Sequence, residues 1–368
     1  MTAKMVTTRI PFGFRRALEI DGEAVSWLNV HDLKMRIGPA IVRVGGIGGV
    51  ATNFRHRMKG YSRRVMTDTT RFMKEQGFDV ALLFGIDSFY HKFGYAPCMP
   101  EMSGSIRTRD AERIGKARGF RIRRAAEKDY PAISRLYAKN VENHTLMMVR
   151  TPKSVAEIRH GSEWRRVPEI FVVENPARRF AGYFIRDAAP AVTTLCEVET
   201  STADALPAIL AALTREAVNR RDGEITFHLA QDHPMTHLMR RLGCEVKARY
   251  RNTGGAMGRI LNQDALLDKV GSAYVHDCSI LSGCKQFAVD VTTEFGTTKV
   301  PVPFTESRPK TKSSLKIPAM TLFQLITGFR DPDEVAKSPG VSAKGGGMEA
   351  VSFFHPGYEP YMYVVDYF

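Results

Sequence analysis

The sequence GVATNFRHRMKGYS, residues 49–62, joins a β-like run to the start of a predicted helix. Five basic side chains crowd around the glycine at position 60: Arg55, Arg57, Lys59, Arg63 and Arg64. A glycine lets the backbone turn tightly, and the first N–H groups of the following helix have no partner within that helix. Because the helix dipole adds positive charge there, such a turn suits a phosphate or pyrophosphate. The alternative is a solvated helix start, which is common on a basic protein.

The segments around this turn predict a mixed unit of strands and helices. Residues 14–50 alternate apolar and polar side chains, with Asp21-Gly22 as a hairpin turn. From Ser62 onward, apolar residues at helical spacing predict a helix that ends at Gly77. A buried strand, FDVALLF, and a short helix through residues 88–95 are expected to follow.

The same order of elements recurs later in the chain. Residues 50–52 (VAT) align with residues 198–200 (VET) at an offset of 148, and Phe93-Gly94 align with Leu242-Gly243 at an offset of 149. Two copies of one supersecondary unit predict two similar domains. The second copy begins with FRIRRAAEKDYPAISRLYAKN, about 75 residues before Val198, and this stretch predicts a strand and an amphipathic helix. The first copy has only 49 residues before Val50. We therefore expect the first copy to lack its opening strand and one or two helices.

A third domain of α+β type is expected after about residue 262. Residues 318–328 predict a helix that ends near Gly328, residues 331–348 predict a mobile loop, and the tail EPYMYVVDYF predicts an apolar strand that ends at Phe368. The predicted fold class is therefore α/β (α+β), with domains at 1–117, 118–262 and 263–368.

The composition excludes several classes of protein. Of the 368 residues, 43% are apolar and 25% charged, which is typical of a folded chain. The absence of a long apolar run and of a signal peptide predicts a cytoplasmic protein without a membrane partner. Five scattered cysteines without CxxC spacing predict reduced thiols and no metal site.

The net charge of +14 is compatible with nucleic acid, a membrane surface or an anionic cofactor. No nucleic-acid-binding motif is visible, so nucleic acid is not the expected partner, and polyanion binding stays open only as an alternative.

Two motifs in this order resemble those of the GNAT superfamily of acyl-CoA-dependent N-acetyltransferases. The family pattern V-x-V-x-P-x-x-R-x-x-G-x-G/A is matched by Val50, Thr52, Arg57, Gly60 and Ser62, with Phe54 in place of the proline. The later pattern F-Y-x-x-x-G-F/Y is matched by Phe89, Tyr90, Gly94 and Tyr95. The three-domain plan resembles the Eis (enhanced intracellular survival) acetyltransferases, which combine two GNAT domains, the second degenerate, with a C-terminal domain like sterol carrier protein 2.

The resemblance implies acetyl-CoA as co-substrate, an amine acceptor such as an aminoglycoside, and a hexameric homo-oligomer. It assigns co-substrate binding to Val50, Ala51, Thr52, Arg57, Met58, Lys59, Gly60, Tyr61, Ser62, Arg63, Gly85 and Ile86. In the second copy the stretch from Val198 to Asp204 has no RxxG behind it and places acid where a phosphate would lie, and Met239 lies near the position that matches Tyr90, so this copy is not expected to bind CoA.

The resemblance also implies a catalytic pair. Tyr90 would protonate the leaving thiolate, since a tyrosine is protonated at neutral pH, and the terminal carboxylate of Phe368 would accept the proton of the amine. Packing in an aromatic cluster is the alternative for Tyr90, a frayed terminus is the alternative for Phe368, and His91 and Asp87 are alternative bases.

The predicted function is therefore acetyl transfer from acetyl-CoA to a primary amine of an aminoglycoside-like, polyamine or lysine acceptor. A non-catalytic acyl-CoA-binding or scaffold protein is the alternative, favoured by the abbreviated first copy.

Overall fold

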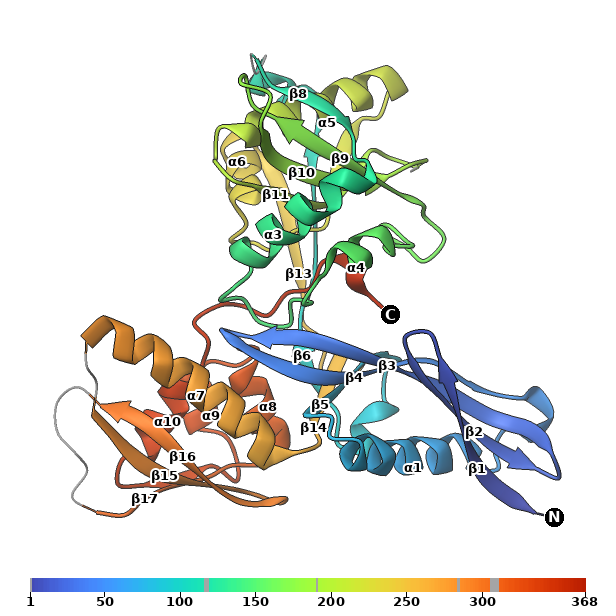
Figure 1. The fold of residues 1–368 in the computed structure, drawn as a ribbon, viewed down its shortest axis with the longest axis vertical. Helices are drawn as coiled ribbons and strands as arrows, with labels where there is room; N and C mark the ends of the chain where they lie inside the picture. Colours follow the sequence, from blue (N-terminus) through green and yellow to red (C-terminus); the bar gives the residue numbers. More distant parts are fainter. Residues whose placement is uncertain (1, 116–118, 190, 283–284, 305–310) are drawn as a thin grey trace.

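The computed structural model describes residues 2–115, 119–189, 191–282, 285–304 and 311–368, and these form three lobes (Figure 1). The side chains of the one close cysteine pair, Cys278 and Cys284, lie outside this description. No helix among the described residues is both long and apolar enough to cross a membrane.

The first lobe is built on a seven-stranded sheet in the order β1-β2-β3-β4-β5-β14-β6. Its strands are β1 (Ala3–Ile10), β2 (Gly13–Ile20), β3 (Glu23–Ile37), β4 (Ala40–Thr52), β5 (Val80–Gly85), β14 (Gly255–Ile260) and β6 (Ala96–Met99). Asp21 and Gly22 both have positive φ, 48° and 89°, as the turn of a two-residue hairpin requires. Helix α1 (Tyr61–Glu75) covers one face with Val65, Met66 and Met73, and the short helices η1 (Phe54–His56) and η2 (Tyr90–Phe93) flank the ends of β4 and β5.

The expectation that the first copy lacks an opening strand is wrong. Strand β1 pairs antiparallel with β2 along its whole length, from Ala3 opposite Ile20 to Ile10 opposite Gly13. Four strands therefore precede α1, as four precede the matching helix of the second copy. What the first copy lacks is a helix between its first two strands, because a tight turn joins them directly.

The second lobe has a sheet in the order β13-β7-β12-β11-β10-β9-β8. Its strands are β7 (Glu101–Arg107), β8 (Arg121–Arg124), β9 (Pro168–Glu174), β10 (Phe180–Asp187), β11 (Thr194–Thr200), β12 (Glu224–Phe227) and β13 (Cys244–Arg249). Its helices are α2 (Thr108–Ala111), η3 (Glu112–Ile114), η4 (Glu127–Asp129), α3 (Tyr130–Asn140), α4 (Pro152–Ala156), α5 (Ala205–Arg220) and α6 (Pro234–Leu242).

The two sheets exchange one strand each. Strand β7 follows β6 in the chain but lies between β12 and β13 of the second sheet, whereas β14 follows β13 but lies between β5 and β6 of the first. The domain limits expected at residues 117 and 262 therefore do not follow the sheets at these two strands. In each copy the exchanged strand takes the same relative place, which matches the internal repeat.

The third lobe carries a four-stranded sheet in the order β16-β15-β17-β18. Its elements are α7 (Gln263–Ser282), β15 (Lys285–Thr293), β16 (Gly296–Phe304), β17 (Ser313–Lys316), α8 (Ala319–Ile326), α9 (Pro332–Ala336), β18 (Ser342–Lys344) and α10 (Gly347–Phe354). Residues of this lobe and of the first sheet share one hydrophobic core, in which Phe323 of α8 packs against Gly258 of β14. The predicted fold class, a mixture of α/β and α+β units, is confirmed.

Two smaller predictions for this lobe are wrong, although α8 does end just before Gly328, which has a φ of 76°. The segment expected to be a mobile loop contains α9, β18 and the start of α10, with Pro332 in the first turn of α9, where the lack of an N–H costs nothing. The tail is not a strand, because its only regular element is the short helix η5 (Val364–Asp366). Its apolar side chains are buried between lobes and not along a sheet edge.

Candidate active site

Strands β4 and β5 lie parallel and then separate. Their paired residues run from Val44 opposite Val80 to Ile47 opposite Leu83, and no pair follows along the described strands. A bulge in β4 accompanies the separation, since Ala51 lies opposite Trp27 but Gly48 lies opposite Asn29 of β3. Two residues of β4 thus face one of β3, and the first of them, Gly49, has the left-handed φ of 59° that this type of bulge requires. The bulge bends β4 away from β5 and leaves backbone there outside the ladder.

The sequence-predicted residues lie on the two sides of this gap. Val50, Ala51 and Thr52 end β4 on one side and are half-buried, while Gly85 and Ile86 follow the last paired residue of β5 on the other. The structure therefore brings these two predicted groups to the same opening. Ile86 is 69% exposed, which leaves an apolar side chain on its rim.

The basic turn after β4 is open and its cations are unpaired. Met58 has a φ of 61° and Gly60 a φ of 77°, so two left-handed residues turn the chain into α1, and a Cβ on Gly60 would meet nothing within 4 Å. Among the described residues, no carboxylate forms a salt bridge with any of five cations near this turn: Arg55, Arg57, Lys59, Arg63 and Arg64.

The helix start itself is arranged for a negative partner. The first turn of α1 holds Arg63 and no acid, although acidic side chains are the ones that the positive helix end stabilises. The half-buried Tyr61 and Ser62 open this helix, with the Tyr61 ring 6.2 Å from that of His56. Some arginines on other elements do form ion pairs, such as Arg16 with Asp68 and Arg43 with Asp32. The five cations gathered at this helix start, with no acidic partner among the described residues, fit an anionic ligand such as the diphosphate of CoA.

Tyr90 lies over the end of β5. A Cβ on Gly85 would meet the Tyr90 ring at 2.6 Å, and the ring packs edge-on against Phe89 at 4.9 Å between centroids. Burial raises the pKa of the Tyr90 phenol above its usual value of 10, so the hydroxyl keeps its proton well above neutral pH. The ring does pack in the aromatic cluster expected as the alternative, and a packed ring can still present its hydroxyl to a ligand.

The C-terminal residue lies against the opposite face of the same two strands. A Cβ on Gly46 would meet the Phe368 ring at 2.7 Å, and a Cβ on Gly48 would lie 3.4 Å from the carboxyl carbon of Phe368. The ring also contacts Phe84 of β5 edge-on at 5.5 Å. Figure 1 shows the C-terminus between the first and second lobes. Tyr90 packs on the α1 face of the strand pair and Phe368 packs on the other face, so the last residue is held against the sheet.

A histidine that the sequence analysis missed shares this place. The Nε2 atom of His31 on β3 would lie 3.3 Å from the same Cβ on Gly48, and its ring lies 5.8 Å from that of Phe368. Burial lowers the pKa of His31, so its imidazole is neutral at pH 7 and can accept a proton. The alternative bases named from the sequence are less suited, because His91 is exposed and Asp87 lies 3.5 Å from Arg251 in an exposed ion pair.

Among its described residues, the second copy has an acid at the matching strand end. Glu199, at the position of Ala51, is buried and accepts hydrogen bonds from Asn140 (2.6 Å) and Tyr363 (2.8 Å). Burial raises its pKa to about 7. Met239 is buried near the position that matches Tyr90. The second copy thus has a buried, hydrogen-bonded acid where the first has Ala51, and a thioether in place of the Tyr90 hydroxyl.

Other hollows offer less chemistry. A cavity of about 790 Å³ on the second sheet is lined by charges of both signs, and its buried Asp187 already accepts two hydrogen bonds from Ser162. Over the described residues, histidine, cysteine and carboxylate side chains form no group of three that could hold a metal ion.

The parallel strand pair that parts after a bulge and the basic helix start both lie within residues 12–98. These residues match the family model described as an acetyltransferase (GNAT) domain. The chain thus carries a GNAT domain at these residues and is an enzyme of the N-acetyltransferase class. The fold of this domain implies acyl transfer from acyl-CoA. A comparison with curated proteins found no match.

Solved structures of similar fold cover nearly the whole chain. A GCN5-related N-acetyltransferase from Kribbella flavida is 15% identical over 96% of this chain and 88% of its own, with a TM-score of 0.72. A probable N-acyltransferase from Enterococcus faecalis is 15% identical over 97% and 90%, with a TM-score of 0.75. Eis1 from Mycobacterium abscessus is 14% identical over 96% and 90%, with a TM-score of 0.64. At these identities the likeness is one of fold.

Proposed function

We propose that this protein transfers the acetyl group of acetyl-CoA to a primary amine of a small molecule, with Tyr90 as general acid and the carboxylate of Phe368 as general base. The observation that carries the proposal is the position of the chain end, whose carboxyl carbon lies next to Gly48 where β4 and β5 part. A buried or half-buried carboxylate beside an acyl site is well suited to take a proton from an amine.

The basic turn would hold the co-substrate. Arg57, Lys59, Arg63 and the backbone N–H groups after Gly60 would contact the diphosphate, and the gap between residues 50–52 and 85–86 would receive the thioester arm. The backbone at the β4 bulge lies outside the ladder, so an N–H there can stabilise the oxyanion that forms at the thioester carbonyl.

The proton balance of the reaction uses both faces of the sheet. The neutral amine forms a C–N bond to the carbonyl carbon and passes a proton to the Phe368 carboxylate, while the C–S bond breaks and the thiolate takes a proton from Tyr90. The thiol of the product has a pKa of about 8.5, below that of the phenol, so the transfer needs the thiolate to be held close. Proton exchange with solvent then restores the acid and the base, and the products are an N-acetyl amine and CoA.

Thiol release from acetyl-CoA with a panel of amines tests this function. The panel contains an aminoglycoside, a polyamine and Nα-acetyl-lysine, because these are the three acceptor types that the resemblance suggests. Tyr90→Phe and removal of Phe368 should each lower kcat by about 100-fold. Tyr130→Phe is the matched control, since this tyrosine lies on α3 of the second lobe. Full activity after both changes would overturn the assigned roles.

The remaining assignments are proposals of finer detail. We infer a third domain like sterol carrier protein 2 at residues 263–368, a homo-oligomer and a cytoplasmic location, as the resemblance to Eis acetyltransferases implies. Sedimentation of the purified protein tests the assembly. The non-catalytic alternative loses its main support, because the first copy has its opening strand after all.

A further inference from the structure

The tail of the chain crosses from the third lobe to the active site by way of the second copy (Figure 1). Its residues Tyr361 to Val365 are buried, yet within the described part of the chain their one backbone hydrogen bond to another segment runs from the Tyr361 N–H to the Thr145 carbonyl, at 3.1 Å. Side chains therefore hold this tail.

Two tyrosines of the tail occupy the gap of the second copy that corresponds to the open gap of the first. Strands β11 and β12 pair at Leu195 opposite Phe227, the counterparts of Ile47 and Leu83, and part beyond that point. Just past it, the Tyr361 hydroxyl donates to the His228 carbonyl at 2.6 Å.

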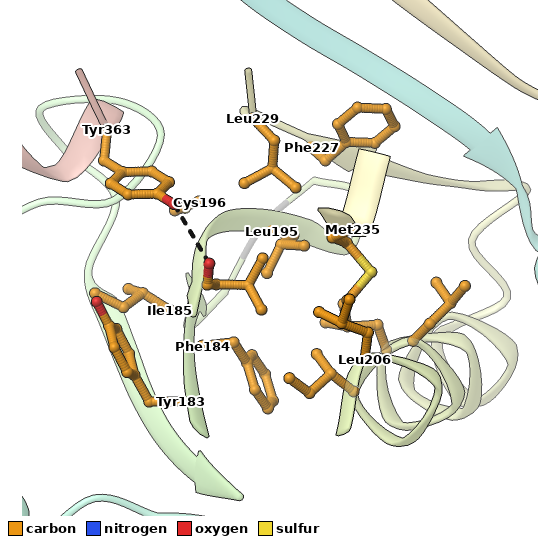
Figure 2. Packing of buried hydrophobic residues seen from close by; sticks show 14 of the residues in the cluster. Tyr183, Phe184, Ile185, Leu195, Cys196, Leu206, Phe227, Leu229, Met235 and Tyr363 are labelled. Carbon is orange, nitrogen blue, oxygen red and sulfur yellow. Dashed lines mark hydrogen bonds between the residues drawn. The ribbon is translucent and has the colours of Figure 1, made fainter. Parts of the chain in front are cut away.

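The second tyrosine, Tyr363, donates its hydroxyl to the Glu199 carboxylate at 2.8 Å, and the Val198 carbonyl oxygen lies 3.3 Å from the same hydroxyl. Figure 2 shows this ring reaching β11. Val198 is the counterpart of Val50, at the end of the first copy's gap. The second copy thus uses its strand gap to bind the tail.

A buried arginine then grips the tail two residues before its end. Arg150 donates to both carboxylate oxygens of Glu197 on β11, at 2.6 Å each, and to both oxygens of Asp366 on the tail, at 3.0 and 2.7 Å. The guanidinium is 2% exposed and also lies 4.1 Å from the ring of Tyr137. A fork of this kind fixes orientation as well as distance.

The two carboxylates that bind Arg150, those of Glu197 and Asp366, have different roles. Glu197 alone neutralises Arg150 within the second lobe, so the fold does not need a second carboxylate there. Asp366 supplies one from the tail. A further hold follows at once, since Nε2 of His160 lies 2.9 Å from the Tyr367 carbonyl oxygen. Two residues span about 7 Å at most, so fixing Asp366 keeps Phe368 close to this cluster.

We propose that the second GNAT copy serves as the holder of the C-terminal tail, with Arg150 and Asp366 as positioning residues that place the Phe368 carboxylate in the first copy. This inference rests on the proposed function of that carboxylate as the base. The second copy would then have kept the fold of an acetyltransferase and exchanged the ligand of its strand gap for a segment of its own chain.

The test combines release of the last residue with kinetics. Carboxypeptidase A removes a C-terminal phenylalanine that it can reach, so free phenylalanine reports on the grip whether or not an acceptor is known. Asp366→Ala and Arg150→Met should release it at least 10-fold faster than the wild type. Glu359→Gln, on the same tail but outside the cluster, should match the wild type.

In the amine assay, Asp366→Ala should lower kcat at least 10-fold and leave the KM for acetyl-CoA within twofold, because the basic turn is untouched. Arg150→Lys keeps the positive charge but loses the bidentate hydrogen bonds, so its kcat should lie between that of the wild type and that of Arg150→Met. Calorimetric binding of CoA and the melting temperature of Asp366→Ala check that the fold persists.

The outcomes separate the two hypotheses. If carboxypeptidase A releases phenylalanine from Asp366→Ala no faster than from the wild type, the proposal that Asp366 holds the tail is overturned, whatever the kinetics show. Faster release with unchanged turnover would overturn the link to the reaction, and the failure would then lie in the base role of Phe368. Faster release with lowered kcat supports the inference.

Discussion

A single methyl group on Gly46 should displace the proposed base. A Cβ at this position would lie 2.7 and 2.9 Å from two ring carbons of Phe368 and 2.8 Å from a methyl carbon of Leu33. Ordinary carbon contacts begin at about 3.5 Å, so the ring has to move by roughly 0.7 Å or more. Gly46→Ala should therefore shift the terminal carboxylate away from Gly48.

The size of the effect follows from this displacement. A misplacement of about 1 Å can cost about 100-fold in rate, and a general base contributes 10²- to 10⁴-fold, so we expect kcat to fall about 100-fold. Extra volume in a packed region costs about 1–3 kcal/mol of stability, which a protein of this size can tolerate. The Kd of CoA should not change, because the contacts described for Phe368, with Gly46, Gly48, His31 and Phe84, lie outside the basic turn.

Gly45→Ala is the matched control. It adds the same methyl group to the preceding residue of β4. This methyl points toward the flexible end of Met73 on α1 and away from Phe368. Steady-state kinetics of both variants, and of Gly46→Ala without Phe368, form a cycle. In the absence of Phe368 the methyl group has no ring to displace, so Gly46→Ala should lower kcat little below that of the protein without Phe368. Equal losses in Gly45→Ala and Gly46→Ala would refute the reasoning.

Three further variants test other parts of the site. Arg57→Ala combined with Lys59→Ala should raise the Kd of CoA about 10-fold, at up to about 1 kcal/mol for each exposed cation, and calorimetry that finds no change would exclude the basic turn as the diphosphate site. Because burial raises the pKa of Tyr90, the activity of the wild type should show no alkaline loss from this group below about pH 10; a loss near pH 9 that Tyr90→Phe removes would contradict its role. Burial raises the pKa of Glu199 from 4.5 to about 7, so the folded state binds a proton that the unfolded state has lost between these values, and the stability of the folded state falls as pH rises through this window. Relative to Glu199→Gln, the wild type should lose about 3 kcal/mol of unfolding free energy between pH 4.5 and 7 in denaturant titrations, and parallel pH curves for the two proteins would argue against this burial effect.

The repeat, the basic turn and Tyr90 could be predicted because local sequence encodes them. Apolar spacing marks α1, Gly77 marks its end, and the offset of 148 residues aligns the points where both strand pairs part. The exchange of β7 and β14 could not be predicted, since both strands have partners far away in the chain and neither has a sequence feature that names them. The opening strand was missed for a related reason. The first copy has only 49 residues before its aligned strand, against about 75 in the second, and the sequence did not show that a tight turn replaces the helix after the opening strand.

Within the site, the sequence located the cation cluster but not the neighbours of the chain end. His31 occupies an ordinary position on a long strand, and only the folded sheet brings it to Gly48 and Phe368. The tail was expected to be a strand because tyrosine and valine favour strands. Tertiary contacts decide otherwise, since its side chains find partners in the second copy and its backbone needs no sheet.

The exchange of β7 and β14 makes the two halves of the protein mutually dependent. A fragment that ends at residue 117 would carry β5 and β6 without the strand that bridges them, and it would carry β7 without β12 and β13. Neither copy can be excised, swapped or inherited alone. A mutation that unfolds the second copy should therefore disrupt the sheet of the first as well.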